Sequence, residues 1–359
     1  CSLGCPPRRT ASPVPMSKAT IDDVAKLAGV SIKTVSRVVN REQNVRESTR
    51  DKVQQAITHL NYRPNISARN LASLRSHLIG LVYDDPSAYE VPSAGYVIRL
   101  QQGALRACAT ADYELLIHPC NYRNRHVGAE LKALIEQARP DGIVLAAPLS
   151  NMPKIVNAIS ATNTPLVRLS TGEKTGKKYT VETNDRVSCA EMTCYLASLG
   201  HERIAFITGH PSHNAIKSRF LGYQDGLRQS NLPFSEDLVA DGDNSSGSGE
   251  ACANKLLALK HAPTAIFAAN DDMAAGVIRA ADKLDIDVPT QLSVAGFDNI
   301  SLAQQIYPSL TTIHQPLAAM AERASLALIN SSGNGSTLQG KDVVPAKLVI
   351  RESTGPAPR

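Results

Sequence analysis

The sequence lacks several patterns that would assign it to a common class of protein. It contains no run of 18 or more apolar residues, so no membrane-spanning helix is expected. Its first fifteen residues include no apolar core of the length that a secretory signal requires. The seven cysteines form no CxxC pair and no regular framework. Without an export signal, we expect reduced thiols and a cytosolic location.

Motifs of catalysis and metal binding are also missing. The nine histidines include no HExxH pattern and no cluster with metal-ligand spacing, so we expect no metal site. No GxSxG nucleophile elbow occurs, and the glycine-rich segment 242–250 lacks the Lys-Ser/Thr pair of a phosphate-binding loop. No paired acid and base stands out either. We therefore expect a binding protein without a cofactor rather than an enzyme.

Charge is distributed unevenly along the 359 residues. Residues 16–75 carry eleven Lys and Arg against five Asp and Glu, whereas the whole chain has a net charge of only +5. A basic N-terminal head on a slightly acidic body indicates a head that meets a polyanion, although a merely solvated basic surface is the alternative. Residues 1–15 hold four prolines and no hydrophobic period. We expect them to be a disordered appendage ahead of Met16.

Residues 16–63 have the pattern of three short helices. Thr20 is placed to cap a helix that runs to a turn at Gly29, and Ser31 to cap a second helix from Ile32 to about Val39. A third helix is expected over residues 47–60, with Arg46 as a poor cap. Two helices joined by a tight Gly-containing turn predict a helix-turn-helix, and a generic three-helix bundle is the alternative.

The second helix of a helix-turn-helix places its first side chains against base edges in the major groove of DNA. Lys33 and Arg37 can donate hydrogen bonds to guanine, and Ile32 can contact a thymine methyl group. With Ser36, these are the expected base-reading residues. Small polar side chains around them are expected to bind phosphates and to set the register: Thr20, Ser31, Thr34, Asn40 and Thr49.

Residues 64–76 read as a hinge that follows the head. Pro64 ends the third helix, and Asn65 can cap a short helical segment that is too short to be stable alone. Leu71 is the apolar side chain suited to wedge between base pairs, and Ala68 is small enough for close approach. A plain linker is the alternative.

The segments TIDDVAKLAGVSIKTVSRVVN and YRPNISARNLA together resemble the DNA-binding head and hinge of the lactose-repressor (LacI/GalR) family, without a gap over about 57 residues. The resemblance implies a homodimer whose two heads bind the half-sites of a palindromic operator in double-stranded DNA. It also implies paired hinge helices that order on DNA, with Leu71 inserted in the minor groove so that the duplex bends. This sequence departs from the family at Arg46, where a capping Ser is common.

The body alternates apolar β segments with helical stretches, which predicts parallel sheets with right-handed crossovers. About ten strands fit two doubly wound lobes. The expected fold class is therefore α/β, with a small all-α head and a two-lobed core. The expected strands occupy residues 76–83, 113–119, 142–148, 165–170, 179–184, 203–209, 238–243, 265–270, 293–298 and 311–315.

Segments such as LGHERIAFITG and PTAIFAANDDMAAGVIRAA resemble the effector-binding core of the same family, which is similar to periplasmic sugar-binding proteins. The resemblance covers about residues 17–353 and implies lobes crossed by three strands. We expect a core over 77–353 and a tail over 354–359, and the tail has no leucine heptads, which favours a dimer over a tetramer. The expected N-lobe is 77–177 with 303–338, and the expected C-lobe is 178–302 with 339–353.

Polar residues just past apolar strands are the candidates for binding an effector. Arg219, Asn270 and Asp298 offer donors and acceptors that suit the vicinal hydroxyls of a sugar. A helix cap is the structural alternative for Asp298, and a salt bridge is the alternative for Arg219. Asp84 at the end of the first strand and Tyr96, whose ring could stack on a sugar, are further candidates.

The family resemblance supports the same three residues, which match recurring effector contacts. His213 is a further candidate, and it stands where purine-responsive members carry an Arg, while Asn244 stands where they carry an aromatic residue. We therefore expect a repressor released from its operator by a sugar or glycoside. The alternatives are a repressor that needs a corepressor such as a nucleobase, a solute-binding protein, and an enzyme of the cleft.

Overall fold

The computed structural model describes residues 19–39, 44–62, 75–84, 95–172, 179–334 and 338–358. The chain divides into two compact units, residues 1–75 and residues 76–359. The expected appendage 1–15, Asn40, and the hinge residues Asn65, Ala68 and Leu71 lie outside the described residues. None of the helices in the described ranges is long and apolar enough to cross a membrane.

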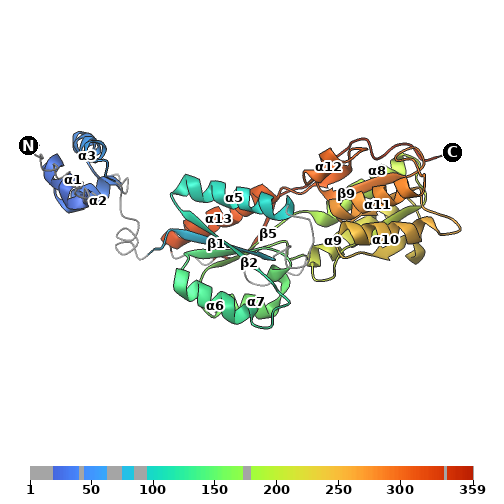
Figure 1. Cartoon of the computed structure of the whole chain (residues 1–359), viewed down its shortest axis with the longest axis horizontal. Helices are drawn as coiled ribbons and strands as arrows, with labels where there is room; N and C mark the ends of the chain where they lie inside the picture. Colours follow the sequence, from blue (N-terminus) through green and yellow to red (C-terminus); the bar gives the residue numbers. More distant parts are fainter. Residues whose placement is uncertain are drawn as a thin grey trace, which may run out of the picture. The chain divides into compact units, whose positions relative to one another are not determined.

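The first unit contains the three predicted helices (Figure 1). Helix α1 spans Ile21–Ala28, α2 spans Ile32–Val39 and α3 spans Glu47–His59. A capping box begins α1, because the Thr20 hydroxyl accepts from the Asp23 N–H at 3.3 Å and the Asp23 carboxylate accepts from the Thr20 N–H at 2.8 Å. Gly29 ends the helix with φ of 65°, in the left-handed region that favours glycine.

The helices of the first unit pack on one small core, formed by Val24, Ala25, Val35, Val38, Val53 and Ala56. The Ser31 hydroxyl accepts from the Thr34 N–H at 3.2 Å, so the predicted cap of α2 is confirmed. Arg46 precedes α3 without a side-chain cap, as its residue type indicates. The three-helix head therefore forms where the sequence predicted it.

The second unit holds two six-stranded sheets, each in the order expected of a doubly wound fold. The first sheet has the order β11-β5-β4-β3-β1-β2, and all its pairings are parallel. Helices α5 and α13 lie side by side on one face, and α6 and α7 lie on the other (Figure 1). Its strands are β1 (Leu78–Asp84), β2 (Glu114–Cys120), β3 (Gly142–Leu145), β4 (Leu166–Leu169), β5 (Thr180–Glu182) and β11 (Lys341–Val343), and its helices are α5 (Gly95–Ala111), α6 (Val127–Ala138), α7 (Pro153–Ser160) and α13 (Leu317–Asn334).

The second sheet has the order β12-β10-β9-β8-β6-β7, in which only β12 pairs antiparallel among the described strands. Its strands are β6 (Ile204–Thr208), β7 (Val239–Asp241), β8 (Ala265–Ala268), β9 (Ser293–Asp298), β10 (Thr311–His314) and β12 (Lys347–Val349). The helices around it are α8 (Asp185–Ser198), α9 (Asn214–Gln229), α10 (Ser246–Leu257), α11 (Asp271–Lys283) and α12 (Leu302–Gln305).

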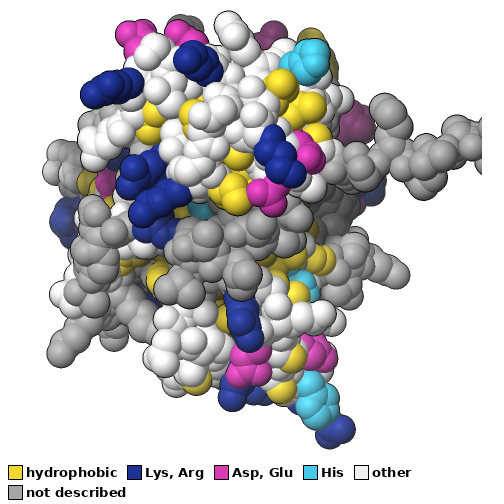
Figure 2. Space-filling view, turned by 90° about the vertical axis from the view of Figure 1, so that its left-hand side faces the viewer, with side chains coloured by type: hydrophobic (Ala, Val, Ile, Leu, Met, Phe, Trp, Pro, Cys, Tyr) yellow, Lys and Arg dark blue, Asp and Glu magenta, His cyan; other side chains and the backbone are white. Residues whose placement is uncertain are grey.

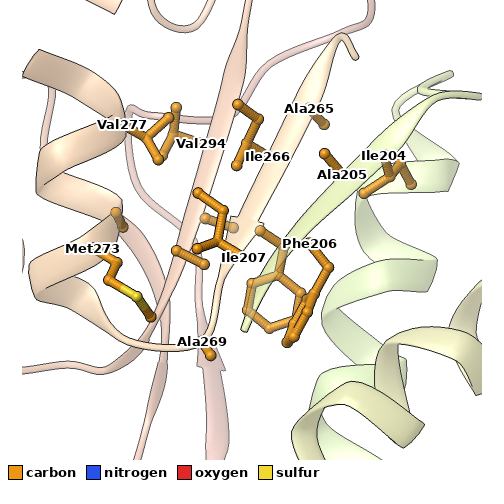
Figure 3. Close-up of a cluster of buried hydrophobic side chains, with 14 of the residues drawn as sticks. Ile204, Ala205, Phe206, Ile207, Ala265, Ile266, Ala269, Met273, Val277 and Val294 are labelled. Carbon is orange, nitrogen blue, oxygen red and sulfur yellow. The ribbon is translucent and has the colours of Figure 1, made fainter. Parts of the chain in front are cut away.

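Each sheet is held by apolar side chains that meet the covering helices. Figure 3 shows Ile204, Phe206 and Ile207 of β6 beside Ile266 of β8, with Met273 of α11 facing the same cluster. Continuous burial along β8 and β9 is typical of parallel strands that are covered on both faces. The buried sheets are therefore a rigid frame whose strand ends position the polar residues described below.

The sheets place the boundaries of the two lobes elsewhere than the sequence analysis expected. We call the part of the core built on the first sheet the first lobe, and the part built on the second sheet the second lobe. Strand β5 pairs with β4, and β11 pairs with β5, so both belong to the first lobe and not to the expected C-lobe. Strand β10 pairs with β9 and belongs to the second lobe, not to the expected N-lobe. The chain therefore crosses between the lobes at 183–184, 315–316 and 344–346. A short apolar strand carries no local mark of which sheet it joins, because its partners are distant in sequence.

Candidate functional site

The outward face of α2 carries the four residues expected to read bases. Val35 and Val38 turn inward to the head core, whereas Ile32 is 47% exposed and Lys33 and Arg37 are exposed. Ser36 is half-buried. Because positions 32, 33, 36 and 37 follow helical spacing, these four side chains share one side of the helix. On the face of the chain drawn in Figure 2, Lys and Arg side chains are exposed together with hydrophobic ones.

The described residues that are expected to bind DNA phosphates lie at or near the first turns of the head helices. The hydroxyls of Ser31 and Thr34 lie 2.9 Å apart at the start of α2, and the Thr20 hydroxyl donates to Asp23 at 2.7 Å. Thr49 lies half-buried in the first turn of α3. These hydroxyls all stand near the N-termini of the head helices, where backbone N–H groups also favour anions.

In the second unit, all six residues expected to bind an effector line a single pocket of about 460 Å³: Asp84, Tyr96, His213, Arg219, Asn270 and Asp298. This volume is within the range of small-molecule sites. The pocket lies at the carboxyl ends of the strands, since residues that follow strands of both sheets contribute to it. Ligands bind at this edge in open α/β sheets.

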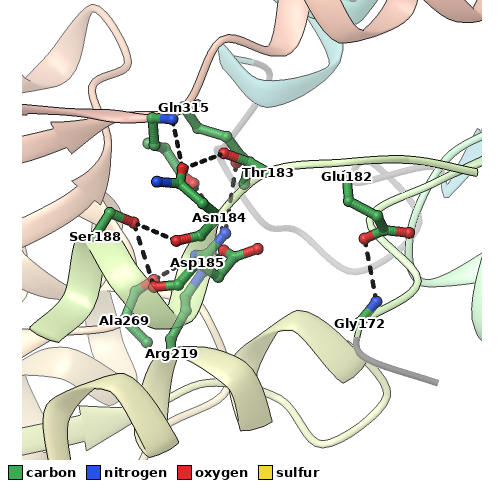
Figure 4. Close-up of polar contacts among 11 residues, drawn as sticks. Gly172, Glu182, Thr183, Asn184, Asp185, Ser188, Arg219, Ala269 and Gln315 are labelled. Carbon is green, nitrogen blue, oxygen red and sulfur yellow. Dashed lines mark hydrogen bonds and ion pairs between the residues drawn. The ribbon is translucent and has the colours of Figure 1, made fainter. Parts of the chain in front are cut away.

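The guanidinium of Arg219, which lines the pocket, donates hydrogen bonds to several acceptors. Its Nε donates to Asp185 Oδ1 at 2.9 Å and its Nη1 donates to the carbonyl oxygen of Ala269 at 2.6 Å (Figure 4). Its guanidinium lies 3.6 Å from the centre of the Phe297 ring. The salt bridge considered as the alternative role for Arg219 is therefore present. The same side chain still lines the pocket, so the two roles coexist.

Asp298 lies at the end of β9 with its side chain 3.5 Å from Nη2 of Arg219. Its φ of 108° is rare for a residue with a Cβ, and the turn is fixed because the Ile300 N–H donates to Asp271 at 2.8 Å. Burial raises the pKa of Asp298 to about 7, although Arg219 opposes this effect. Ser301 and not Asp298 occupies the cap position of the next helix.

Asn270 has a structural role that the sequence analysis did not assign to it. Its Oδ1 accepts from the Met273 N–H at 2.9 Å and so caps α11, while its Nδ2 donates to the Asn244 carbonyl at 2.9 Å. Both contacts orient the amide at the pocket wall. Each polar atom retains one unused hydrogen-bonding position beyond these two contacts.

His213 is neutral at physiological pH. Burial, together with the nearby charges of Arg219 and His210, lowers the pKa of His213 to about 4. Its Nδ1 lies 3.4 Å from the Asn244 amide nitrogen, which can only donate. The proton is therefore assigned to Nε2, which makes His213 a neutral donor to any group that reaches this nitrogen.

The structure adds polar and aromatic pocket residues that were not candidates in the sequence analysis, namely Tyr83, Tyr122, Arg123, Ser170, His210, Asp243, Asn244 and Gln315. Ser170 follows β4 and Gln315 follows β10, so the rule used for Asn270 and Asp298 could have found both. Asp185 could not have been found in this way. It begins α8, and only the fold brings it to Arg219. In the described ranges, no group of three His, Cys, Asp or Glu could hold a metal ion.

A helix-turn-helix head and a two-lobed core with a polar pocket are the architecture of a DNA-binding regulator. Residues 20–65 match the model of bacterial regulatory proteins of the lacI family, and residues 193–354 match a periplasmic binding protein-like domain. The HTH-type transcriptional regulator DegA of Bacillus subtilis (strain 168) is 35% identical over 342 residues, which cover 94% of this chain and 99% of DegA. The chain therefore belongs to the lacI family and is a DNA-binding transcriptional repressor.

Other relatives agree with this assignment. The HTH-type transcriptional repressor PurR of Yersinia pestis bv. Antiqua (strain Antiqua) is 33% identical over 345 residues, 95% of this chain and 98% of PurR. The lac repressor dimer bound to operator and the anti-inducer ONPF matches with a TM-score of 0.76 and 26% identity, covering 94% of this chain and all of that one. A complex of the transcriptional regulator CelR with cellobiose matches with a TM-score of 0.71 and 26% identity, covering 93% and 99%.

Proposed function

We propose that the chain is a dimeric, cytoplasmic repressor that leaves a palindromic operator when a sugar or glycoside fills the pocket. The observation that carries this proposal is the convergence of Arg219, Asn270 and Asp298 on one pocket, with their polar groups fixed by neighbouring residues. A guanidinium, an amide and a carboxyl group together suit vicinal hydroxyls, which both donate and accept hydrogen bonds.

A sugar is favoured over a nucleobase by the pocket wall itself. His213 and Asn244 line the pocket at the positions where the family resemblance places an Arg and an aromatic residue in purine-responsive members. The similar solved structures include complexes of CelR with cellobiose and of the lac repressor with ONPG. For this chain, both points support a carbohydrate effector.

The proposed mechanism couples two binding equilibria. An effector that binds between the lobes would change how the two first lobes of the dimer face one another, so that the hinge segments no longer pair and order on DNA. Asn65, Ala68 and Leu71 would carry the contact with the minor groove. Such couplings amount to about 1–3 kcal/mol, which corresponds to a change of about 5- to 150-fold in operator affinity.

Selection of bound duplexes from random DNA, followed by operator-shift assays with a sugar panel, tests the proposal. We expect a palindrome to be enriched and at least one sugar to weaken its binding. An effector that tightens operator binding would instead establish the corepressor alternative. Failure to bind any duplex at low ionic strength would contradict the proposal altogether.

Lys33→Ala is expected to weaken operator binding by about 1–3 kcal/mol and to relax the base preference at one operator position, because Lys33 lies at the start of the proposed reading helix. Lys26→Ala is the matched control, since it removes the same charge from the exposed last turn of α1. The Lys26→Ala variant should bind all operator sequences more weakly to the same extent, or bind them as the wild type does. Binding to a library of single-base operator variants checks the result, and identical preference profiles for the two variants would contradict the role of Lys33.

A further inference from the structure

The buried positive charge of the pocket is balanced by neighbouring carboxyl groups. Arg219 is the buried guanidinium among the described lining residues, and it lies between Asp185 at 2.9 Å and Asp298 at 3.5 Å. Burial lowers the pKa of Arg219, but the two carboxyl groups outweigh burial and raise it overall, so the guanidinium stays charged. An anionic ligand would therefore find no buried cation that lacks a counter-charge in the described part of this wall.

Further charges around the pocket also disfavour an anion. Asp84 and Asp243 line it, while the second lining guanidinium, Arg123, is exposed to solvent. A carboxylate or phosphate in the pocket would be placed near several carboxyl groups, and the charge of the exposed Arg123 would be screened by water. Like-charge contacts of this kind are how binding sites exclude unwanted ligands.

Three polar atoms of the pocket residues have no hydrogen-bond partner although they are buried: the hydroxyl oxygen of Tyr96, Oγ of Ser170 and Nε2 of Gln315. Ser170 and Gln315 are 3% and 1% exposed. The Ser170 hydroxyl lies close enough to lower the pKa of Tyr96 slightly, against the larger effect of burial, yet the two groups form no well-aligned hydrogen bond. Buried polar groups without partners are rare in folded proteins, which points to a partner that a ligand supplies.

The chemistry of these three atoms specifies the partner. Two hydroxyl groups both donate and accept, and the Gln315 amide nitrogen only donates, while its Oε1 already accepts from Arg219 Nη2 at 3.4 Å. Hydroxyl groups of a ligand can satisfy all three. We propose that the pocket selects a neutral sugar over sugar acids and sugar phosphates, with Tyr96, Ser170 and Gln315 recognising its hydroxyl groups. This inference rests on the sugar-binding function proposed above.

Isothermal titration calorimetry with matched ligands tests the selection. The probes are D-glucose with D-glucuronate and D-glucose 6-phosphate, D-galactose with D-galacturonate, D-ribose with D-ribose 5-phosphate, and cellobiose with cellobiouronate. We expect at least one neutral sugar to bind, and its charged counterpart to bind at least about 10-fold more weakly. Equal or tighter binding of a charged counterpart would overturn the inference but leave the sugar-binding function intact. Absence of binding by every probe would overturn both.

Tyr96→Phe tests the recognition of hydroxyls with the sugar that binds. The variant removes only the unpartnered hydroxyl, so the melting temperature of the protein without sugar should stay unchanged or rise. Sugar affinity should fall by about 10-fold, because the ligand hydroxyl loses its partner. Tyr113→Phe is the control, since Tyr113 is also buried but does not line the pocket. Unchanged affinity in Tyr96→Phe, or an equal loss in both variants, would overturn the role of Tyr96.

Discussion

Arg219→Met is expected to lower the free energy of unfolding by about 3–5 kcal/mol and to abolish the response to the effector. The substitution leaves Asp185 and Asp298 buried, with side-chain exposures of 4% and 12%, and without the guanidinium between them. Breaking a buried ion pair from one side has this cost because the remaining charge stays out of water. The same change removes the central donor of the proposed sugar site.

Urea unfolding and operator-shift assays measure both effects. Arg203→Met is the matched control, because Arg203 forms an ion pair with Asp237 in the same lobe at 3.3 Å, but the two side chains are 37% and 47% exposed. It should cost less than about 1 kcal/mol. The double variant Arg219→Met with Asp185→Asn should recover part of the lost stability. An Arg219→Met variant as stable as the control would contradict the central position of this side chain.

The contribution of Asp298 to stability is expected to fall as the pH rises from about 4 to about 7. Its pKa is raised from an ordinary value of 3.8 to about 7, so between these values the folded protein holds a proton that the unfolded chain releases. Relative to Asp298→Asn, the wild type should therefore lose about 2–3 kcal/mol of stability between pH 5 and pH 7, because one pKa unit corresponds to about 1.4 kcal/mol. Above the folded pKa the difference should level off.

Urea unfolding of both proteins from pH 5 to pH 8 checks this expectation. Asp225→Asn is the control, since hydrogen bonding from Arg186 lowers the pKa of Asp225 and moves its titration below this window. The difference between the wild type and Asp225→Asn should stay flat. A flat difference for Asp298→Asn as well would mean that Asp298 remains a carboxylate throughout, held by Arg219.

Much of the local structure follows from short-range rules. The capping of α1 by Thr20, the end of that helix at Gly29 and the uncapped start of α3 at Arg46 all agree with residue type. The ten expected strands of the core are present for the same reason, because runs of apolar residues bounded by polar turns indicate buried strands. Among the strands in the described ranges, only the edge strands β11 and β12 were not anticipated, and each is three residues long.

The pocket was found in part by a rule that holds for the whole fold class. Polar residues at strand ends lie at one edge of a parallel sheet, which is why Asp84, Asn270 and Asp298 could be expected to converge. Tyr96 lies in α5, His213 precedes α9 and Arg219 lies in α9, so the rule does not cover them. The rule was applied too narrowly, since Ser170 and Gln315 satisfy it equally well. It did not show that Asn270 caps α11, although an Asn directly before a helix is a preferred N-cap residue and this signal is local.

The sequence by itself determined the three-helix head, the alternation of strands and helices, and the polar residues that end the strands, because each of these depends on neighbours within a few positions. Only the tertiary structure decided which sheet β5, β10 and β11 join, and that Asp185 lies against Arg219. Those outcomes depend on contacts between residues far apart along the chain, where backbone pairing and burial select partners that local patterns do not encode.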